Sequence, residues 1–285
     1  MKPEISIIIP CYNENPEILK KTLSEIDTTL SSYSHEIIIV DDASSKYNYE
    51  TCIVENCKLI RHKFNKGYGA AIKTGILNTR YSIIGITDAD GTYPNEYFAE
   101  MIEKMENNVM IIGARKWQDI GLLRRLPKYL LTKYASYLSG FPIKDLNSGM
   151  RIFRKDIALE FWRLFPNRFS FTSTITMSCI TNGYEIEYYY IPYYKRQGKS
   201  KINPIKDTIR FFSLVTKLSL YFNPFRFFFP LSLFFLLIAI ARGIRDYMIN
   251  GYLGGLALVL FFMSFQVFFF GLIAQIISRT RNIKF

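Results

Sequence analysis

The sequence predicts an α/β domain built on a mostly parallel sheet, followed by a basic helix at a membrane surface and a hairpin of two membrane-spanning helices. Short β-branched runs alternate with helix-type segments over the first 200 residues. Such repeats form a sheet that is covered by helices on both faces. From residue 225 onward, two long and almost uncharged stretches follow, which are typical of membrane spans.

Each expected strand of the first domain is a short apolar run. The first, second and fourth runs stop at Pro10, Asp41 and Asp88. Because open α/β sheets bind ligands beyond the carboxyl ends of their strands, we expect these polar segments to form a binding site. The expected strands are 5–9, 36–40, 58–61, 82–87 and 109–113, and the expected helices are 16–30 and 69–79.

A change of composition marks the end of the α/β domain, which we place at residues 1–202. Residues 195–226 carry eight basic residues and one acid. Within 203–224, Lys206, Arg210 and Lys217 fall on one stripe of an otherwise apolar helix. This pattern is typical of a basic helix that lies in a membrane interface.

The remaining residues, 225–285, are expected to hold two transmembrane helices at about 225–246 and 253–278. The stretch 247–278 has no charged residue over 32 positions, and about 20 apolar residues suffice to cross a bilayer. Asn250-Gly251 and Gly254-Gly255 supply the turn between them.

The distribution of charge indicates where the protein works. The formal charge is +12, and residues 201–285 hold a surplus of eight positive charges beside the apolar spans. This placement favours membrane lipid over nucleic acid as the partner. The chain opens Met1-Lys2-Pro3-Glu4 without a secretory signal pattern. Because both hairpin flanks are basic, we expect an integral membrane protein whose α/β domain is cytoplasmic.

Asp88-Ala89-Asp90 is the sharpest local signal for chemistry. The two carboxylates follow an apolar run directly and precede Gly91. Carboxylates placed in this way can hold a hard cation that also binds phosphate oxygens. Mg²⁺ or Mn²⁺ suits such ligands. For an isolated Asp-x-Asp pair a turn or a helix cap is the better explanation, so the neighbouring segments decide its meaning.

Three further polar segments follow predicted strands or precede a predicted helix. These are Pro10-Cys11-Tyr12-Asn13-Glu14, Asp41-Asp42-Ala43-Ser44-Ser45 and Asn65-Lys66-Gly67-Tyr68-Gly69. Glycines and helix-start amides allow a phosphate to approach the backbone. We therefore expect a nucleotide-sized cleft in which Asp41, Asp88 and Asp90 gather around one cation.

Taken in order, these segments resemble family 2 glycosyltransferases of the GT-A fold, whose sheet is Rossmann-like. More narrowly, they are similar to the dolichyl- and polyprenyl-phosphate sugar synthases, of the dolichol-phosphate mannose synthase type. The resemblance covers residues 4 to about 202. It implies that Tyr12, Glu14 and Asp41 contact the base and ribose, and that Asp88 and Asp90 hold the metal and the diphosphate. The expected nucleotide site also includes Pro10, Asn13, Asp42, Lys66, Gly67 and Ala89.

Three later segments resemble the lipid-phosphate branch of the family. They are Ile112-Gly113-Ala114-Arg115, the segment Asp145–Arg151, and the segment Tyr194–Lys201. The resemblance implies that Arg196 and Lys199, with Ser200, cover the donor phosphates. It also implies that Arg115 and Arg125 receive the lipid phosphate, with Ser148 nearby and Arg124 as an equal candidate for Arg125. Asp90, Arg115 and Arg196 are the expected catalytic groups.

The implied reaction is an inverting transfer of a hexose from GDP-mannose or UDP-glucose to dolichyl or polyprenyl phosphate. A lipid phosphate is already ionised and needs no general base, so His35 and His62 are expected to be structural. The two tryptophans, Trp117 and Trp162, do not lie in a Gln-x-x-Arg-Trp segment, which argues against polymer synthesis.

Two alternatives stay open. One is transfer to a sugar or glycolipid hydroxyl with Asp145 as the base, and the other is a non-catalytic membrane scaffold. The identity of the base and sugar, the lipid length, the oligomeric state and the pathway served do not follow from the sequence. The four cysteines show neither a metal-type spacing nor a disulfide framework and are expected to be reduced thiols.

Overall fold

The computed structural model describes residues 4–116, 122–168, 170–194 and 204–282. The chain forms two compact units, each of which is described by itself. Residues 1–133 and 143–211 make the first unit, and residues 134–142 and 212–285 make the second.

The first unit contains a seven-stranded sheet with the order β3-β2-β1-β4-β6-β5-β7. β6 is antiparallel to both of its neighbours, and the other pairs are parallel. The strands are β1 (Ile5–Cys11), β2 (His35–Asp41), β3 (Cys57–Arg61), β4 (Ile83–Ile86), β5 (Met110–Arg115), β6 (Arg151–Arg154) and β7 (Ile186–Ile191). The predicted mostly parallel sheet is confirmed, and all five expected strands are present.

Two strands were not predicted. β6 carries an arginine at each end, and Arg151 is fully buried. Sequence patterning places arginine at the surface, so this strand had no apolar signature. β7 carries a run of three tyrosines, of which Tyr188 and Tyr189 are half-buried and Tyr190 is exposed, and it has no clear alternation.

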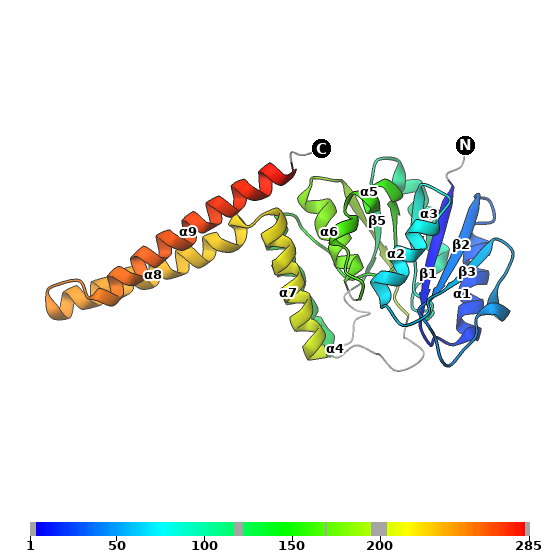
Figure 1. The fold of residues 1–285 in the computed structure, drawn as a ribbon, viewed down its shortest axis with the longest axis horizontal. Coiled ribbons are helices and arrows are strands. Elements are labelled where there is room, and N and C mark those ends of the chain that lie inside the picture. Colours follow the sequence, from blue (N-terminus) through cyan, green and yellow to red (C-terminus); the bar gives the residue numbers. More distant parts are fainter. Residues whose placement is uncertain (1–3, 117–121, 169, 195–203, 283–285) are drawn as a thin grey trace. The chain divides into compact units, whose positions relative to one another are not determined.

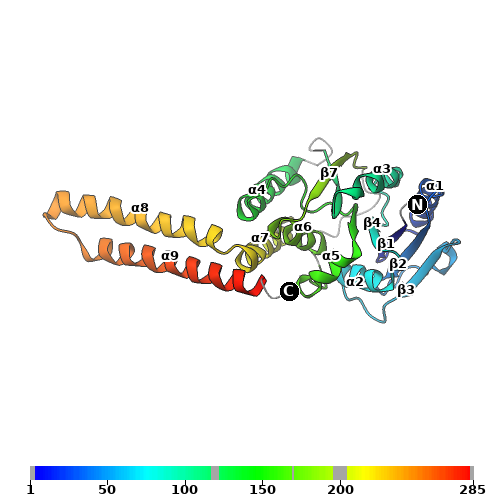
Figure 2. The ribbon, with the colours of Figure 1, turned by 90° about the horizontal axis from the view of Figure 1, so that it is seen from above.

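Helices cover both faces of this sheet. The helices of the chain are α1 (Pro16–Thr29), α2 (Tyr68–Asn78), α3 (Phe98–Glu103), α4 (Leu122–Ser139), α5 (Lys155–Glu160), α6 (Phe171–Thr181), α7 (Pro204–Phe222), α8 (Phe225–Asn250) and α9 (Gly255–Asn282). α1 and α3 pack on one face, and α2 lies on the other (Figure 2).

Alternation along β1 assigns these faces. Ile5, Ile7 and Ile9 belong to the core that α1 and α3 complete. Ile8 points to the opposite face, where it meets α2 at Gly75. A Cβ at Gly75 would lie 2.5 Å from Cγ2 of Ile8, so only glycine allows this approach. The strand is therefore buried on both faces, as expected for a parallel sheet under two helical layers.

The parallel strands β1, β2 and β4 bring their carboxyl ends to one edge. Cys11 pairs with Asp41, and Ile8 pairs with Ile86. Because β6 runs in the opposite direction, its first residue, Arg151, pairs with Ile86 at this same edge. The segment that precedes β6 therefore arrives where the segment that follows β4 departs.

The second unit contains the hairpin of α8 and α9, which run side by side (Figure 1). Small or short residues recur every seven positions on the buried side of α9, and they let the two helices approach closely. A Cβ at Gly271 would lie 2.8 Å from Cβ of Phe228. The buried positions of α9 are Ala257, Ser264, Gly271 and Ser278.

Two helices of this unit are long and apolar enough to cross a membrane, Phe225–Asn250 and Gly255–Thr280. Each has 26 residues, and only 17% of its most apolar window is buried inside the protein. At 1.5 Å per residue each spans about 39 Å, which exceeds the roughly 30 Å of a bilayer core. The two expected spans are present as helices, and Gly251 ends α8 with a positive φ of 77°.

Candidate active site

The loops after β1 and β2 are joined by hydrogen bonds at the shared edge. The backbone N–H of Asn13 donates to Oγ of Ser44 (2.8 Å). The side-chain oxygen of Asn13 accepts from the backbone N–H groups of Ser45 (3.0 Å) and Lys46 (2.9 Å). Asn13 adopts a left-handed φ of 54°, a conformation that asparagine tolerates. Asn13 therefore shapes this edge, and the ring of Tyr12 beside it is exposed.

Asp41 is buried, and its carboxylate serves the loop that follows it. Oδ1 accepts from the backbone N–H of Ser44 (2.8 Å), and Oδ2 lies 3.2 Å from Nε of Arg61. Among the described residues, no group of three or more His, Cys, Asp or Glu side chains could hold a metal. The expectation that Asp41 joins Asp88 and Asp90 around one cation is therefore wrong.

Asp42 organises the loop before α2 from inside the protein. Its Oδ1 accepts from the backbone N–H of Lys66 (2.8 Å) and lies 2.7 Å from Nδ1 of His62, while Oδ2 accepts from the N–H of Gly67 (2.7 Å). Nε2 of the same imidazole lies 2.9 Å from Oγ1 of Thr74. Asp42 and His62 are both buried. We call these contacts the Asp42 clamp, and they place the Lys66–Gly67 backbone.

Asp88 and Asp90 follow β4 in different environments. Asp88 is half-buried, and its Oδ1 accepts from the hydroxyl of Tyr68 (3.2 Å). Asp90 is almost buried, and its Oδ1 accepts from both the N–H (3.2 Å) and the hydroxyl (2.6 Å) of Thr92. Ala89 between them is buried. Asp88 is thus the more accessible carboxylate of the pair.

This pair fits a magnesium or manganese ion that arrives with a substrate. Mg²⁺ is commonly bound by one or two carboxylates together with substrate phosphates, without a complete protein cage. A half-exposed Asp88 beside a nearly buried Asp90 provides such a partial set. In the described part of the chain no third carboxylate joins this pair, so the remaining ligands of such a cation would come from a diphosphate.

A glycine holds the segment before β6 against Asp88. A Cβ at Gly149 would lie 2.8 Å from Oδ2 of Asp88. The N–H of Gly149 donates to the hydroxyl of Tyr93 (2.7 Å). The ring of Tyr93 packs edge-on against Tyr193, with centroids 5.4 Å apart, and the guanidinium of Arg115 lies 5.2 Å from the centre of the Tyr193 ring. These contacts connect the Asp88 region to Arg115.

Arg115 and Lys128 converge on one fully buried carboxylate, that of Asp145. Arg115 binds it with two bonds, Nε to Oδ2 (2.8 Å) and Nη2 to Oδ1 (2.9 Å). Nζ of Lys128, from α4, donates to Oδ2 (2.9 Å). We call these three residues the Asp145 cluster. The side chains of Arg115 and Lys128 keep 15% and 14% exposure, so both cations are mostly buried beside the anion but retain some contact with solvent.

The pKa values of the Asp145 cluster follow from burial and charge. Burial alone would raise the pKa of Asp145, but Arg115 and Lys128 hold it well below its ordinary value. Burial lowers the pKa of Lys128 to about 8, against the opposing pull of Asp145. Asp145 therefore stays ionised at neutral pH and is a weak base, while Lys128 is charged at pH 7 and loses its charge just above it.

Ser148 lies inside the fold. It is fully buried, and its hydroxyl donates to the carbonyl of Gly113 (2.5 Å). Its own carbonyl accepts from the buried guanidinium of Arg151, which also donates to the carbonyl of Thr172 (2.9 Å). Ser148 thus fixes the segment that carries Gly149, and the structure does not place it at the surface that a lipid phosphate would reach.

The other expected residues fall in different surroundings. Pro10 lies in β1, the backbone of Glu14 exchanges two hydrogen bonds with the hydroxyl of Tyr49, and Arg125 is half-buried on α4. Arg196, Lys199 and Ser200 lie outside the described residues, as does the side chain of Arg124. Sequence reasoning missed Lys128, Gly149, Tyr68 and Tyr93. Tyr68 and Gly149 lie inside the quoted segments but were given no role there, whereas Lys128 had no signal beyond its place on a basic helix.

The fold is shared with solved glycosyltransferases. The glucosyl-3-phosphoglycerate synthase of Mycobacterium tuberculosis, solved with Mn²⁺, uridine diphosphate and phosphoglyceric acid, superposes with a TM-score of 0.60 at 13% identity. The match covers 76% of this chain and 78% of that one. The first unit therefore has the GT-A fold.

Sequence comparison then gives the family. Residues 6–162 match Glycosyl transferase family 2, so the chain belongs to that family and is a glycosyltransferase. Residues 223–280 match the GtrB C-terminal hairpin, which supports membrane association.

Named relatives share this sequence at modest identity. A dolichyl-phosphate hexose transferase of Haloferax volcanii is 22% identical over 206 residues, which cover 70% of this chain and 87% of the relative. A dolichol-phosphate mannosyltransferase of Pyrococcus furiosus is 30% identical over 54% of this chain and 47% of its own length. A dolichyl-phosphate beta-glucosyltransferase of Dictyostelium discoideum is 31% identical over 57% of this chain and 56% of its own length. The chain thus spans about half the length of the last two relatives.

Proposed function

We propose that this protein transfers a hexose from a nucleotide-sugar to the phosphate of a dolichyl or polyprenyl lipid, with inversion at the anomeric carbon. GDP-mannose and UDP-glucose are the candidate donors. Membership of family 2, the named relatives and the hairpin support this reaction. We place the first unit on the cytoplasmic side, because the flanks of the hairpin are basic.

The donor diphosphate is held at the edge where β1, β2 and β4 end. Asp88 and Asp90 hold Mg²⁺ or Mn²⁺, which would neutralise the charge that develops on the leaving diphosphate. The Asp42 clamp presents the Lys66 and Gly67 backbone beside it. Tyr12, Asn13 and Glu14 border the nucleoside, and Asp41 acts through the loop it holds. Arg196 and Lys199 remain predicted phosphate contacts.

The Asp145 cluster is the observation that carries the choice of acceptor. Two mostly buried cations, each with some exposed surface, lie beside a segment that packs against Asp88. Charge-assisted bonds from arginine and lysine are the strong contacts for phosphate. We therefore assign the acceptor phosphate to Arg115 and Lys128, with the half-buried Arg125 as a further contact.

The same cluster argues against transfer to a hydroxyl acceptor, because that reaction would need Asp145 as a general base. Both carboxylate oxygens of Asp145 already accept hydrogen bonds, the side chain is fully buried, and its pKa is lowered. A general base needs access to the proton and a pKa near the working pH. A phosphate attacks without this help, so catalysis rests on positioning and on charge neutralisation.

Product formation by the full chain in detergent tests the proposal. The protein is given each nucleotide-sugar with Mn²⁺ and either a polyprenyl phosphate or the matching polyprenol. We expect a glycosyl lipid from the phosphate only, and EDTA should abolish it. Transfer to the polyprenol would refute the assignment of the acceptor. A thermal-shift comparison of GDP and UDP with Mn²⁺ selects the base, since a ligand stabilises the fold that binds it.

A further inference from the structure

One side chain between the Asp145 cluster and Asp88 has a hydrogen-bond donor without a partner in the described part of the chain. It belongs to Asn147, which follows Asp145 by two residues and precedes Gly149 by two. Its Cα therefore lies within about 7 Å of theirs. Gly149 in turn packs against the carboxylate of Asp88. Asn147 thus lies on the stretch of chain that joins the proposed acceptor side of the site to the proposed metal side.

The carboxamide of Asn147 is held at one of its two ends. Its Oδ1 accepts from the hydroxyl of Ser173 (2.5 Å), which is fully buried on α6. The backbone N–H of Asn147 donates to Oδ1 of Asp145 (3.2 Å), so the main chain is fixed as well. Nδ2 carries two N–H groups and makes no hydrogen bond to the described residues. It is not among the described atoms that are buried without a partner, so a ligand can reach it.

An oriented, uncharged donor suits a hydroxyl better than a phosphate. Charged donors make the stronger bonds to phosphate, and Arg115 and Lys128 supply them on Asp145 nearby. An amide N–H pairs well with a lone pair of a hydroxyl oxygen. Asn147 is half-buried, so a ligand that covers it without accepting a hydrogen bond would leave a polar group unsatisfied at a cost. The ligand at Nδ2 should therefore carry a hydroxyl.

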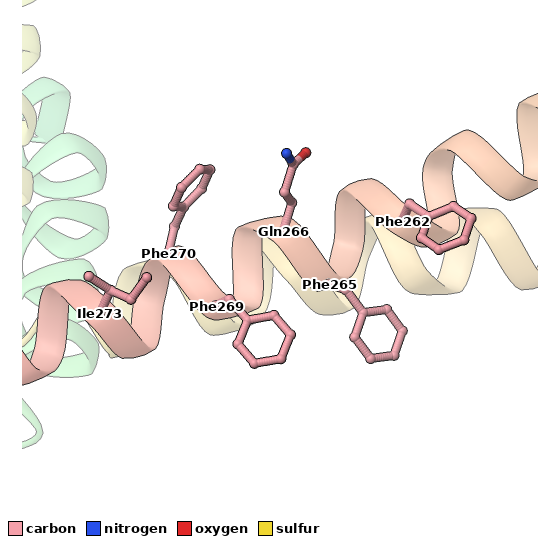
Figure 3. Close-up of a pocket in the computed structure, with 6 residues that line it drawn as sticks. All are labelled: Phe262, Phe265, Gln266, Phe269, Phe270 and Ile273. Atoms are coloured by element: carbon pink, nitrogen blue, oxygen red, sulfur yellow. The ribbon is translucent and has the colours of Figure 1, made fainter.

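Another carboxamide that makes no hydrogen bond to the described residues is that of Gln266 on α9. Figure 3 shows it projecting from the same side of the helix as Phe270. The other residues that line the groove around it are all apolar, namely Phe262, Phe265, Phe269, Phe270 and Ile273. This groove offers one polar group for the several hydroxyls of a hexose and no charged group for a phosphate. Asn147, by contrast, lies between charged groups that can hold both phosphates of the reaction.

We infer that Nδ2 of Asn147 donates a hydrogen bond to a hydroxyl of the hexose while the hexose is still attached to the nucleotide. The inference rests on the proposed function, which puts the anomeric carbon between the diphosphate at Asp88 and the phosphate at Arg115 and Lys128. A hexose at that point lies beside the segment that carries Asn147. Because Ser173 fixes the amide, the contact selects a hydroxyl at one position of the ring, and Asn147 contributes to the choice of sugar.

Equilibrium binding without an acceptor tests this contact. The dissociation constants of UDP-glucose, GDP-mannose, UDP and GDP are measured by calorimetry with Mn²⁺ and the full chain in detergent. For the nucleotide-hexose that the wild type binds, Asn147→Ala should raise the constant roughly 2- to 12-fold, as expected for one uncharged hydrogen bond. The constant for the matching nucleoside diphosphate should not change, which also shows that the variant is folded.

Asn108→Ala is the matched control for this measurement. Asn108 is half-buried just before β5, at the opposite end of that strand from Arg115. Its substitution should leave both constants unchanged. Ser173→Ala, which frees the amide of Asn147 without removing it, should give a smaller loss than Asn147→Ala.

Mono-deoxy analogues of the bound donor identify the hydroxyl. The wild type should bind one of them more weakly by a similar factor, and Asn147→Ala should bind that analogue and the parent donor equally well. The inference is overturned if Asn147→Ala weakens the nucleoside diphosphate as much as the nucleotide-hexose, or weakens neither, or keeps the wild-type preference against every deoxy analogue. Failure of the wild type to bind either nucleotide-hexose would overturn the proposed donors together with the inference, whereas transfer to a polyprenol would overturn the proposed acceptor alone.

Discussion

Removing the charge of Lys128 should lower kcat/KM for the lipid phosphate acceptor without unfolding the domain. In Lys128→Met, Asp145 keeps its two bonds from Arg115, so the buried carboxylate stays paired. A hydrogen bond to a charged group contributes about 1.5–3 kcal/mol, and this range corresponds to roughly 10- to 150-fold in an equilibrium constant. We expect a loss of that size in kcat/KM for the polyprenyl phosphate at pH 7, with little change in KM for the nucleotide-sugar.

The pH dependence of kcat/KM for the lipid tests the role of the Lys128 charge directly. Lys128 has a pKa of about 8, so it is mostly charged at pH 7 and roughly one-tenth charged at pH 9. Its contribution to phosphate binding is complete below its pKa and is lost as the pH rises through it. Between pH 7 and pH 9, kcat/KM for the lipid should therefore fall by up to about tenfold in the wild type. Arginine keeps its charge, so Lys128→Arg should flatten this decline.

Initial rates at low lipid concentration, in buffers of constant ionic strength, measure both effects. Lys133→Met is the matched control, because Lys133 is exposed on the same helix and should leave the rate unchanged. The reasoning is refuted if Lys128→Arg and the wild type share one pH profile. It is also refuted if Lys128→Met raises KM for the donor as much as KM for the lipid.

Three further substitutions test the donor side. Asp88→Asn should lower kcat by on the order of 100-fold or more and abolish the Mn²⁺-dependent thermal shift by nucleoside diphosphate, and a normal shift would remove Asp88 from the metal site. His62→Ala takes one partner from the buried Asp42 clamp and should cost about 1.5–3 kcal/mol of unfolding free energy in urea titrations, while KM for the donor rises more than kcat falls. Gly149→Ala would place a methyl group 2.8 Å from Oδ2 of Asp88, so it should weaken Mn²⁺-dependent nucleotide binding, and unaltered binding would contradict the close approach.

The sequence predicted the elements whose signals are local. β1 and β2 are uninterrupted β-branched runs, and their identity does not depend on distant residues. The two spans were equally readable, because length and apolar composition are enough to define them. α1 begins at Pro16, after an Asn15 side chain that accepts from the N–H of Glu17, a local start signal.

The positions of side chains whose partners are distant in the sequence could not be predicted from local patterns. Arg151 is buried because carbonyl and hydroxyl groups on α6 receive its guanidinium, and these partners lie more than twenty positions away. Lys128 gains its importance from Asp145, which only the fold brings near. The residue types at Asp41 and Asp42 suggested ligands, but the directions of their side chains depend on backbone N–H groups in neighbouring loops.

Sequence also left open what faces the membrane interior. The uncharged stretch 247–278 gave the span, but a helical period does not say which side of α9 meets α8. The repeat of small residues at Ala257, Ser264 and Gly271 acquires its meaning only when α8 is placed beside it.

Because β6 runs antiparallel to β4, two separate sets of segments meet at one edge of the sheet. The loops to which we assign the donor leave the sheet there after β1, β2 and β4, while the chain that carries Lys128, Asp145 and Gly149 comes back to the same rim before entering β6. In the proposed reaction, the stretch between β5 and β6 therefore supplies the acceptor side of this rim, and the loops after the parallel strands supply the donor side.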